Sequence, residues 1–528
     1  MGLIPVKNEH FERVISLSKD NRRFILAEEV ILHYAHTVFK NYKVIDRVII
    51  RVTRNADIDP KDEGDFRENM EALVSARKKL EPVRLELSDN FSHTALEYIC
   101  KKLKLKNSNV FYSRIPLDLS YLFGFKKLSE EPALVYPKRE SQKSTSFSES
   151  RSLLAQIRSK DFLLSYPYES INTFIKLLAE ASQDKSVTDI KITLYRLASN
   201  SKIVNALCNA SENGKNVTVL VELRARFDEE NNIGWSKVLQ RSGCKVIYGP
   251  KDYKVHSKLL LITRKTRNGE EYITQIGTGN YNEKTSKLYT DLSLITSNTE
   301  IAQDAKNVFE KLLNGEFVES TSRLLVAPLC LQNRILAMID EEIKHAQNGE
   351  PAYVSAKINS LSDRRIIDKL VEASQAGVKI ELVIRGICCL ISGVPGYTEN
   401  ITVRSIVGRF LEHSRIYIFG TEERRKIYIS SADYMTRNTT NRVEVAVPVL
   451  DEKIKKRIWD MFTVLISDNT KARIQQNNGV YVKAEHKENT PSINAQEYFY
   501  DEAYKKADAK KAKQERQKKS RESAKKKA

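Results

Sequence analysis

The chain of 528 residues contains an internal repeat, and this repeat limits the folds that it can adopt. Residues 202–226, "KIVNALCNASENGKNVTVLVELRAR", align with residues 365–389, "RIIDKLVEASQAGVKIELVIRGICC", at a constant offset of 163. In both copies, apolar residues at helical spacing end at a glycine, Gly214 or Gly377, and a β-branched run follows. A helix that leads into an apolar strand is typical of a buried, largely parallel sheet. The repeat therefore predicts two duplicated α/β domains in tandem.

A second part of the repeat carries polar residues inside apolar strands. "KVHSKLLLI" corresponds to "LEHSRIYIF", which places His256 and Lys258 opposite His413 and Arg415. Side chains two residues apart on a strand point to the same face, so each copy presents an imidazole beside a cation. Downstream, at an offset of 153, "GTGNYN" matches "SSADYM" and "TDLSLI" matches "VEVAVP". The corresponding residues are Asn280 and Asp433 in the turn, and Asp291 and Glu444 in the following strand. A histidine that merely reaches solvent at a strand end would not explain this duplication.

Composition divides the chain into five stretches. Six of the twelve residues 141–152 are serine, which predicts a linker before the repeat. The end of the chain is dominated by lysine and alanine, which predicts a disordered tail. The expected divisions are a mixed α/β head domain over 1–138, a Ser-rich linker over 139–152, a first repeat domain over 153–322, a second over 323–475, and a basic, disordered tail over 476–528.

The charge of the chain indicates its partners. The net charge is +19, and residues 505–528 contribute +9 of it through twelve Lys/Arg against three Asp/Glu. The remaining +10 indicates a polyanionic or phosphorylated substrate, an RNA, or an acidic membrane surface. No apolar run approaches the ~20 residues of a membrane span. The six cysteines are scattered, which suits reduced thiols and predicts a cytoplasmic protein.

Two histidines, each beside a fixed cation, suit phosphoryl transfer. One neutral imidazole can attack phosphorus while the other acts as general acid or base, and Lys258 and Arg415 would neutralise phosphate oxygens. Ligands of α/β sheets bind outside the carboxyl ends of strands. Three further arginines lie at or just past such ends: Arg196, Arg226 and Arg385. Taken singly, an arginine there is more often a surface residue or an ion-pair partner.

The paired H-x-[K/R] sites resemble those of the phospholipase D superfamily, in which two halves share one active site. The usual phosphodiesterase motif of that superfamily has an aspartate five residues after the lysine. This chain has Thr263 and Gly420 at those positions. The departure weakens a lipase or nuclease assignment and leaves a phospholipase D-like phosphodiesterase as the alternative function.

Several stretches are similar to the histidine-phosphorylating polyphosphate kinases: "ARFDEENNI", "KVHSKLLL", "GTGNYNEKTSKLYTDLSL", "ASQAGVKIELVIRGICCL", "VRSIVGRFLEHSRI" and "YISSADYM". This resemblance runs to about Arg473. It implies two tandem phospholipase D-like α/β domains preceded by a mixed α/β head domain. It also implies reversible transfer of the terminal phosphate of ATP to inorganic polyphosphate. The implied partners are ATP, ADP and polyphosphate, and the implied assembly is a homo-oligomer. No specific nucleic acid is implied, and the resemblance allows peripheral membrane association.

The resemblance assigns roles to the site residues. His256 would become the phosphohistidine, with Lys258 beside it, and His413 would be the second essential histidine, with Arg415 beside it. The expected contacts of the ATP phosphates are Tyr289, Arg385, His413 and Asp291.

Magnesium is the cofactor that the resemblance implies. Arg196 and Arg226 match the positions where the family places Mg²⁺. A guanidinium carries only donors and cannot ligate a cation. We therefore expect both arginines to hold phosphate oxygens whose other faces carry Mg²⁺.

One departure from the family concerns the start of the chain. The family begins with a helical domain that contributes to nucleotide-base binding, and nothing in this sequence resembles it. A further alternative is therefore a catalytically impaired remnant that binds polyphosphate.

Overall fold

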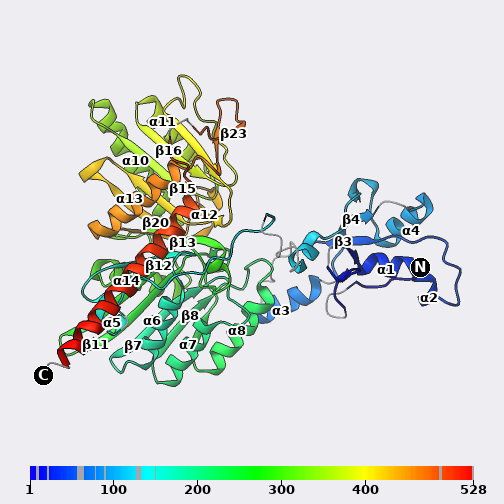
Figure 1. Cartoon of the computed structure of the whole chain (residues 1–528), viewed down its shortest axis with the longest axis horizontal. Coiled ribbons are helices and arrows are strands. Elements are labelled where there is room, and N and C mark those ends of the chain that lie inside the picture. The colour runs from blue at the N-terminus through cyan, green and yellow to red at the C-terminus, as the bar shows by residue number, and fades with distance from the viewer. Residues whose placement is uncertain are drawn as a thin grey trace. The chain divides into compact units, whose positions relative to one another are not determined.

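The computed structural model describes residues 1–6, 11–20, 23–55, 65–77, 79–88, 91–125, 133–148, 150–486 and 490–525. The chain divides into two compact units, Met1–Lys138 and Arg139–Ala528 (Figure 1). Within the described ranges, no helix is both long enough and apolar enough to cross a membrane.

The first unit is a small mixed α/β fold. Its sheet has the order β3-β4-β5, with β4 antiparallel to β3 and parallel to β5. Helix α4 covers this sheet, and the two share a core of Leu85, Leu87, Leu96, Ile99 and Cys100. The elements are β1 (Val14–Ser16), β2 (Phe24–Leu26), α1 (Ala27–His33), α2 (Ala35–Val38), β3 (Ile50–Arg54), α3 (Phe66–Arg77), β4 (Pro82–Ser88), α4 (His93–Leu103) and β5 (Val110–Ser113).

The second unit holds the two repeat domains, each built on one large sheet. The first sheet has the order β18-β13-β12-β11-β7-β8-β9, with β6 paired to β13. Its strands are β6 (Phe162–Tyr166), β7 (Val187–Leu194), β8 (Asn216–Val221), β9 (Lys245–Ile247), β11 (Leu259–Thr266), β12 (Gly269–Gly277) and β13 (Tyr289–Thr296). Its helices are α5 (Leu153–Ile157), α6 (Asn172–Gln183), α7 (Lys202–Glu212), α8 (Glu229–Arg241) and α9 (Thr299–Leu313).

The second sheet repeats this plan with the order β10-β21-β20-β19-β15-β16-β17-β22-β23, and β14 pairs with β21. Its strands are β14 (Leu325–Ala327), β15 (Tyr353–Ile358), β16 (Lys379–Ile384), β17 (Ile401–Ile406), β19 (Arg415–Phe419), β20 (Lys426–Ser430), β21 (Arg442–Pro448), β22 (Ala472–Gln475) and β23 (Tyr481–Lys483). Its helices are α10 (Leu331–Gln347), α11 (Arg364–Gln375), α12 (Thr436–Thr440) and α13 (Glu452–Ile466).

The repeat in the sequence is a repeat in the fold. Helix α7 begins after Ser201, whose side chain caps it, and α11 begins after Asp363, which does the same. Both helices lead through a left-handed glycine, Gly214 (φ 79°) or Gly377 (φ 92°), into a strand parallel to its neighbour. The predicted αβ units are thus confirmed, since local capping and strand signals fix both ends of each unit.

Two short strands change places between the halves. Strand β10 (Lys254–Val255) comes from the first half but pairs in parallel with β21 of the second. Strand β18 (Leu411–Glu412) comes from the second half but pairs in parallel with β13 of the first. The exchange ties the two sheets edge to edge.

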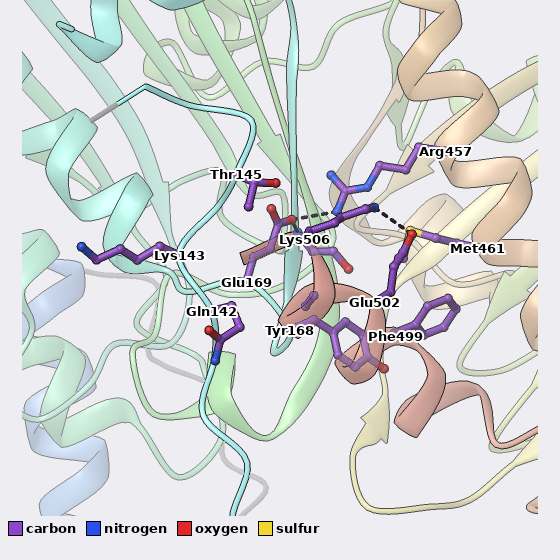
Figure 2. A pocket seen from close by; sticks show the side chains of 12 residues that line it. Gln142, Lys143, Thr145, Tyr168, Glu169, Arg457, Met461, Phe499, Glu502 and Lys506 are labelled. Atoms are coloured by element: carbon purple, nitrogen blue, oxygen red, sulfur yellow. Dashed lines mark hydrogen bonds and ion pairs between the residues drawn. The ribbon is translucent and has the colours of Figure 1, made fainter. Parts of the chain in front are cut away.

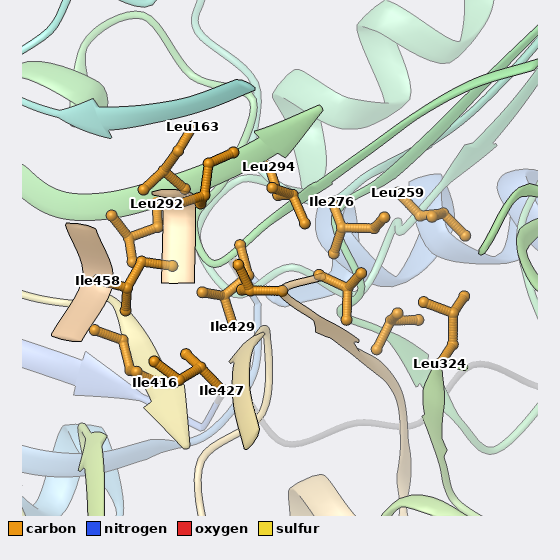
Figure 3. Close-up of a cluster of buried hydrophobic side chains, with 14 of the residues drawn as sticks. Leu163, Leu259, Ile276, Leu292, Leu294, Leu324, Ile416, Ile427, Ile429 and Ile458 are labelled. Carbon is orange, nitrogen blue, oxygen red and sulfur yellow. The ribbon is translucent and has the colours of Figure 1, made fainter. Parts of the chain in front are cut away.

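A single apolar core spans the two halves. Figure 3 shows Leu292 and Leu294 of β13 facing Ile416 of β19 and Ile429 of β20. These four side chains are buried. Each buried aliphatic side chain contributes about 1.5–3 kcal/mol relative to exposure. The halves therefore form one body, which fixes the position of any site between them.

Two predicted segments differ from the expectation. In the Ser-rich segment 139–152, Phe147 is buried and stacks on Phe162 with ring centroids 3.8 Å apart, so this stretch lies against the fold. The tail predicted over 476–528 as disordered instead forms β23 and the long helix α14 (Ala495–Lys525) within its described part. The prediction was wrong there because it averaged over basic residues and overlooked Phe499 and Tyr500, which are buried.

Candidate active site

The exchanged strands bring the two predicted histidines together. His256 follows β10, and its backbone N–H donates to Val443 O across the interface (2.9 Å). His413 follows β18, and its backbone N–H donates to Thr290 Oγ1 (3.1 Å). Both imidazoles are buried. Each histidine is thus held by the half of the molecule to which it does not belong.

Each histidine also takes its carboxylate from the opposite half. His256 Nδ1 donates to Glu444 Oε1 over 2.9 Å, and His413 Nδ1 donates to Asp291 Oδ1 over 2.8 Å. An ionised carboxylate only accepts hydrogen bonds, so the proton of a neutral imidazole resides on Nδ1. The Nε2 lone pair of His256 is then available for chemistry, whereas that of His413 accepts from Arg415 Nη1 at 3.3 Å.

The two carboxylates are themselves fixed by polar neighbours. Glu444 accepts from Asn438 Nδ2 and Ser431 Oγ, each at 2.5 Å, and Asp291 accepts from Thr278 Oγ1 at 2.6 Å. A Cβ added at Gly279 would lie 2.0 Å from Asp291 Oδ2. That glycine therefore leaves the space that the Asp291 carboxylate occupies.

Burial sets the protonation state of the two rings. Desolvation lowers the pKa of His256 well below its usual range, and the charges of Lys258 and Arg442 lower it further. Desolvation also lowers the pKa of His413, and it outweighs the opposing effect of Asp291. Both imidazoles are neutral at neutral pH, as a nucleophile or a base requires.

The two predicted cations differ in how they are compensated. Arg415 is buried, and its Nη2 donates to Asp433 Oδ2 over 3.1 Å. Lys258 is buried as well, its Nζ bonds the His256 carbonyl, and no ion pair of the described residues includes it. The repeat places Asn280, an uncharged amide, where the second half has Asp433.

The environment of Lys258 follows from that difference. Desolvation lowers the pKa of Lys258 well below its usual range, and Glu444 only partly opposes this. Arg415 has the opposite balance: desolvation lowers its pKa, but Asp433, with Asp291 and Glu444, outweighs this effect and raises the pKa of Arg415. An incoming anion would therefore stabilise the protonated, cationic form of Lys258 in the first half of the site.

Two of the predicted phosphate contacts lie next to His413. The ring of Tyr289 has its centroid 5.2 Å from that of His413. Arg385 Nε donates to Asn359 Oδ1 (2.9 Å) and to Glu412 O (2.7 Å), one residue before the histidine. Tyr289 and Arg385 thus lie at the second half of the site, and their contact with the ATP phosphates stays a prediction.

The other two predicted arginines lie on the rim of the first half. Arg196 Nε forms an ion pair with Asp228 Oδ2 (3.0 Å), and its Nη2 donates to Arg226 O (3.2 Å). The preceding residue, Tyr195, meets His256 edge to face, with ring centroids 4.7 Å apart. Arg226 is exposed. Arg196 thus lies one residue from the ring that packs on His256, and the backbone carbonyl of Arg226 is joined to Arg196.

The positions that separate this chain from phosphodiesterases carry no carboxylate. Thr263 lies within β11 and pairs with Tyr272 and Asp189 of its neighbours. Gly420 follows β19 in a left-handed turn with φ 84°. Neither position could supply an acid to the histidines.

The sequence assigned no role to four residues of the site, two of which were named only as counterparts in the repeat. Asn359 is the least visible, since no motif marks the end of β15. Glu444 and Asp433 had a signal in the repeat, where they correspond to Asp291 and Asn280. The fourth is Arg442, whose charge lowers the pKa of His256. Its backbone pairing with Lys254, which brings it there, depends on the strand exchange.

Comparison with known proteins gives the family. Three polyphosphate kinase domain profiles match the chain: the middle domain over residues 1–125, C-terminal domain 1 over 152–318 and C-terminal domain 2 over 324–496. A polyphosphate kinase of Staphylococcus epidermidis is 41% identical over 500 residues, which cover 93% of this chain and 68% of that protein. One of Bacillus anthracis is 42% identical over 488 residues, covering 91% and 69%.

A solved structure agrees. The polyphosphate kinase of Porphyromonas gingivalis superposes with a TM-score of 0.81 at 32% identity, covering 95% of this chain and 74% of that one. The predicted fold class, two tandem phospholipase D-like α/β domains after a mixed α/β head domain, is confirmed. The chain belongs to the polyphosphate kinase family.

Proposed function

We propose that this chain is an ATP–polyphosphate phosphotransferase that carries the phosphoryl group on His256. The observation that favours His256 over His413 is that, within the described part of the chain, only one of the two neighbouring cations, Arg415, has a carboxylate partner in an ion pair. Arg415 already has Asp433 as a partner, whereas Lys258 is buried next to His256 without an ion pair among the described residues. A phosphoryl group on His256 would supply the missing negative charge.

The first step is attack of His256 Nε2 on the γ-phosphorus of ATP. A nitrogen–phosphorus bond forms, the bond from the γ-phosphorus to the β,γ-bridging oxygen breaks, and ADP leaves with that oxygen. Positive charge develops on the imidazole ring, and Glu444 stabilises it through the Nδ1–H bond. Lys258 and Arg415 neutralise the charge on the transferring oxygens.

The second step returns the phosphoryl group to a chain end. A terminal phosphate oxygen of polyphosphate attacks the phosphorus of phosphohistidine, and the nitrogen–phosphorus bond breaks. His413 is neutral and keeps its Nδ1–H on Asp291, so its Nε2 would accept the proton of a protonated terminal phosphate once the 3.3 Å contact with Arg415 Nη1 is released. Both steps exchange one phosphoric anhydride or phosphoramidate bond for another, which supports a reversible reaction.

Mg²⁺ fits this scheme as part of the nucleotide substrate. The described residues contain no group of three or more His, Cys, Asp or Glu arranged to hold a metal ion. Magnesium ordinarily keeps several waters and binds through substrate phosphates with few protein ligands. We propose that MgATP binds as a unit, and that Arg196 and Arg226 hold phosphate oxygens on its outer side. Magnesium would spread the negative charge of the phosphates during transfer.

We also propose that the reaction takes place in the cytoplasm, where ATP is supplied. Cysteine chemistry supports this setting: the described cysteines are all free thiols, and four of the six are buried. A reducing compartment keeps such thiols unpaired.

The decisive experiment is labelling with γ-³²P-ATP and Mg²⁺. The wild-type chain is expected to gain an acid-labile, base-stable label, as phosphoramidates do, and His256→Ala is expected to gain none. His345→Ala is the matched control, because His345 lies half-buried on α10 beside Glu350. An unlabelled wild type, or undiminished label in His256→Ala, would contradict the proposal. If His256→Ala is labelled and His413→Ala is not, His413 would be the residue that carries the phosphoryl group.

A further inference from the structure

Helix α14 consists of two unlike parts. Its inner part, Ala495–Tyr504, packs on the fold: Phe499 and Tyr500 are buried, and both lie against Tyr168 at ring centroid distances of 5.3 and 5.2 Å. Figure 2 shows Phe499 beside Tyr168, near Arg457 of α13. The cavity left between them is about 20 Å³, room for about one water molecule. The inner part is therefore an anchor and leaves no space for a ligand.

The anchor reaches the active site. Gln496 is buried, and its Nε2 donates to Glu412 Oε1 over 2.6 Å, one residue before His413. Its Oε1 accepts from the backbone N–H of Phe410 at 2.9 Å. A Cβ at Gly408 would lie 2.7 Å from that same oxygen. The helix thus starts at a fixed distance from the second histidine.

The outer part, Lys505–Lys525, is basic on every side. It carries ten Lys/Arg against three Asp/Glu, and beyond Tyr504 its apolar residues are all alanine. Its basic residues fall all around a period of 3.6 residues per turn, so they leave no apolar stripe. A helix that lies in a membrane surface, or that docks in a protein groove, needs such a stripe. This composition suits a flexible linear polyanion.

Acidic residues offset little of the charge of the outer part. Lys510 Nζ donates to the backbone carbonyl oxygens of Ser144, Thr145 and Phe147, which hold it without neutralising its charge. Lys506 pairs with Glu502 (2.7 Å) and Lys511 with Asp508 (3.8 Å), both at exposed positions where a pair is worth little. Cations three or four residues apart, such as Lys510 and Lys513 or Lys513 and Arg516, repel one another along the helix. A bound polyanion would relieve this repulsion and stabilise the helix.

We propose that the outer part of α14 binds the polyphosphate chain that the active site elongates. This inference rests on the proposed function, since polyphosphate is its product. A helix of 31 residues at a rise of 1.5 Å per residue is about 46 Å long. Because its inner end is fixed beside His413, the basic part holds a growing chain near the site after each transfer. Chains held in this way gain more phosphates per encounter.

The test compares two variants that each lose four positive charges. The first is Lys511→Gln, Lys513→Gln, Arg516→Gln and Lys519→Gln, all exposed positions of α14. The control is Lys101→Gln, Lys104→Gln, Lys106→Gln and Lys453→Gln, exposed positions elsewhere. Binding of long-chain polyphosphate is measured at several salt concentrations. With roughly 0.7 counterions released per contact on a single-stranded polyanion, the α14 variant is expected to lower the salt slope by up to about 3 and to weaken binding at least 10-fold. The control is expected to change binding less than 3-fold.

Two further measurements separate this inference from the proposed function. Labelling of His256 by γ-³²P-ATP is expected to keep its wild-type rate in the α14 variant, while polyphosphate made at equal turnover becomes shorter. Long-chain polyphosphate is expected to protect the basic part of wild-type α14 from trypsin.

Equal binding loss in both variants, unchanged product length, or no protection from trypsin would overturn the inference. So would tighter binding of single-stranded RNA than of polyphosphate at equal charge, which would make α14 an RNA-binding element. A wild type that is not labelled by ATP would overturn the proposed function alone, because polyphosphate binding would still be measurable.

Discussion

Nδ1 of His256 lies 2.9 Å from Oε1 of Glu444, a residue 188 positions away in the opposite half of the catalytic unit. The reciprocal bond joins His413 to Asp291. Each of these two histidines is therefore oriented by a carboxylate that belongs to the other copy of the repeat.

Replacing Glu444 by glutamine is expected to slow phosphorylation of His256 by roughly 10²–10⁴-fold, by analogy with loss of the orienting carboxylate in catalytic triads. The amide can donate to Nδ1, which favours the proton on Nε2 and removes the nucleophilic lone pair. Rapid-quench labelling with γ-³²P-ATP measures the rate. Asp291→Asn is the matched variant, since it perturbs His413 and should leave more of the first step intact. Equal rates in Glu444→Gln and wild type would show that the tautomer is set elsewhere.

The pH dependence of labelling is expected to report the depressed pKa of His256. Burial, Lys258 and Arg442 lower this pKa, so the ring stays neutral in the folded protein below the usual value of about 6.5. The acid limb of the labelling rate should then have its midpoint below about pH 6.5. Arg442→Gln removes one cation and should move the midpoint to higher pH.

The same shift has a consequence for stability. Below the usual histidine pKa the unfolded chain takes up a proton that the folded chain does not, so this group destabilises the fold as pH falls.

For the labelling rate, an acid-limb midpoint at or above about pH 6.5 in the wild type, or no change of that midpoint in Arg442→Gln, would contradict the depressed pKa of His256.

Gly279→Ala is expected to damage the site through Asp291. The new Cβ would lie 2.0 Å from Asp291 Oδ2, so the carboxylate would have to move away from His413. Polyphosphate synthesis should fall at least 10-fold with little change in the urea midpoint. The control is Gly277→Ala, where the nearest atom is the Gln275 amide nitrogen at 3.1 Å. Similar activity in the two variants would mean that the close approach of Asp291 is not required.

Glu412→Gln is expected to destabilise the fold by about 3 kcal/mol, as removal of one partner from a buried ion pair does. Glu412 Oε2 lies 2.9 Å from Lys357 Nζ, with both side chains buried, and it also accepts from Thr290 Oγ1 at 2.9 Å. Gln496→Ala removes only the neutral partner of Glu412 and should cost about 1–2 kcal/mol. Urea unfolding of the two variants measures the difference, and the reverse order would contradict the ion-pair account.

Asn280→Asp is expected to reduce the amount of stable phosphohistidine. By the repeat, the change would give the first half a carboxylate at the position of Asp433, which accepts from Arg415 in the second half, and we expect it to compete with phosphate for Lys258. Labelling stoichiometry at saturating ATP should fall several-fold. Asp433→Asn is the converse variant and should instead disturb Arg415. Full stoichiometry in Asn280→Asp would show that the charge difference between the halves does not select the carrier.

The sequence predicted the repeat units well because their signals are local. The caps Ser201 and Asp363 and the glycines Gly214 and Gly377 define α7 and α11 with the strands that follow. The strand exchange could not be predicted, because β10 and β18 each contain two residues and have no periodicity to read.

The partners in the site were predicted unevenly for the same reason. His256, His413 and their cations follow from a pattern of four residues, whereas the pairing of Glu444 with His256 depends on a contact between distant segments. The inner part of α14 was overlooked because its few aromatic residues are diluted by the lysines that follow.

The exchange of β10 and β18 also affects how such a chain can change over generations. A substitution near His256 acts on a carboxylate inherited with the second half, and one near His413 acts on a carboxylate inherited with the first. The two copies are therefore expected to co-vary across the repeat boundary, position by position. In a chimera that takes one repeat copy from a distant relative, the histidine of that copy would face a carboxylate with which it did not evolve.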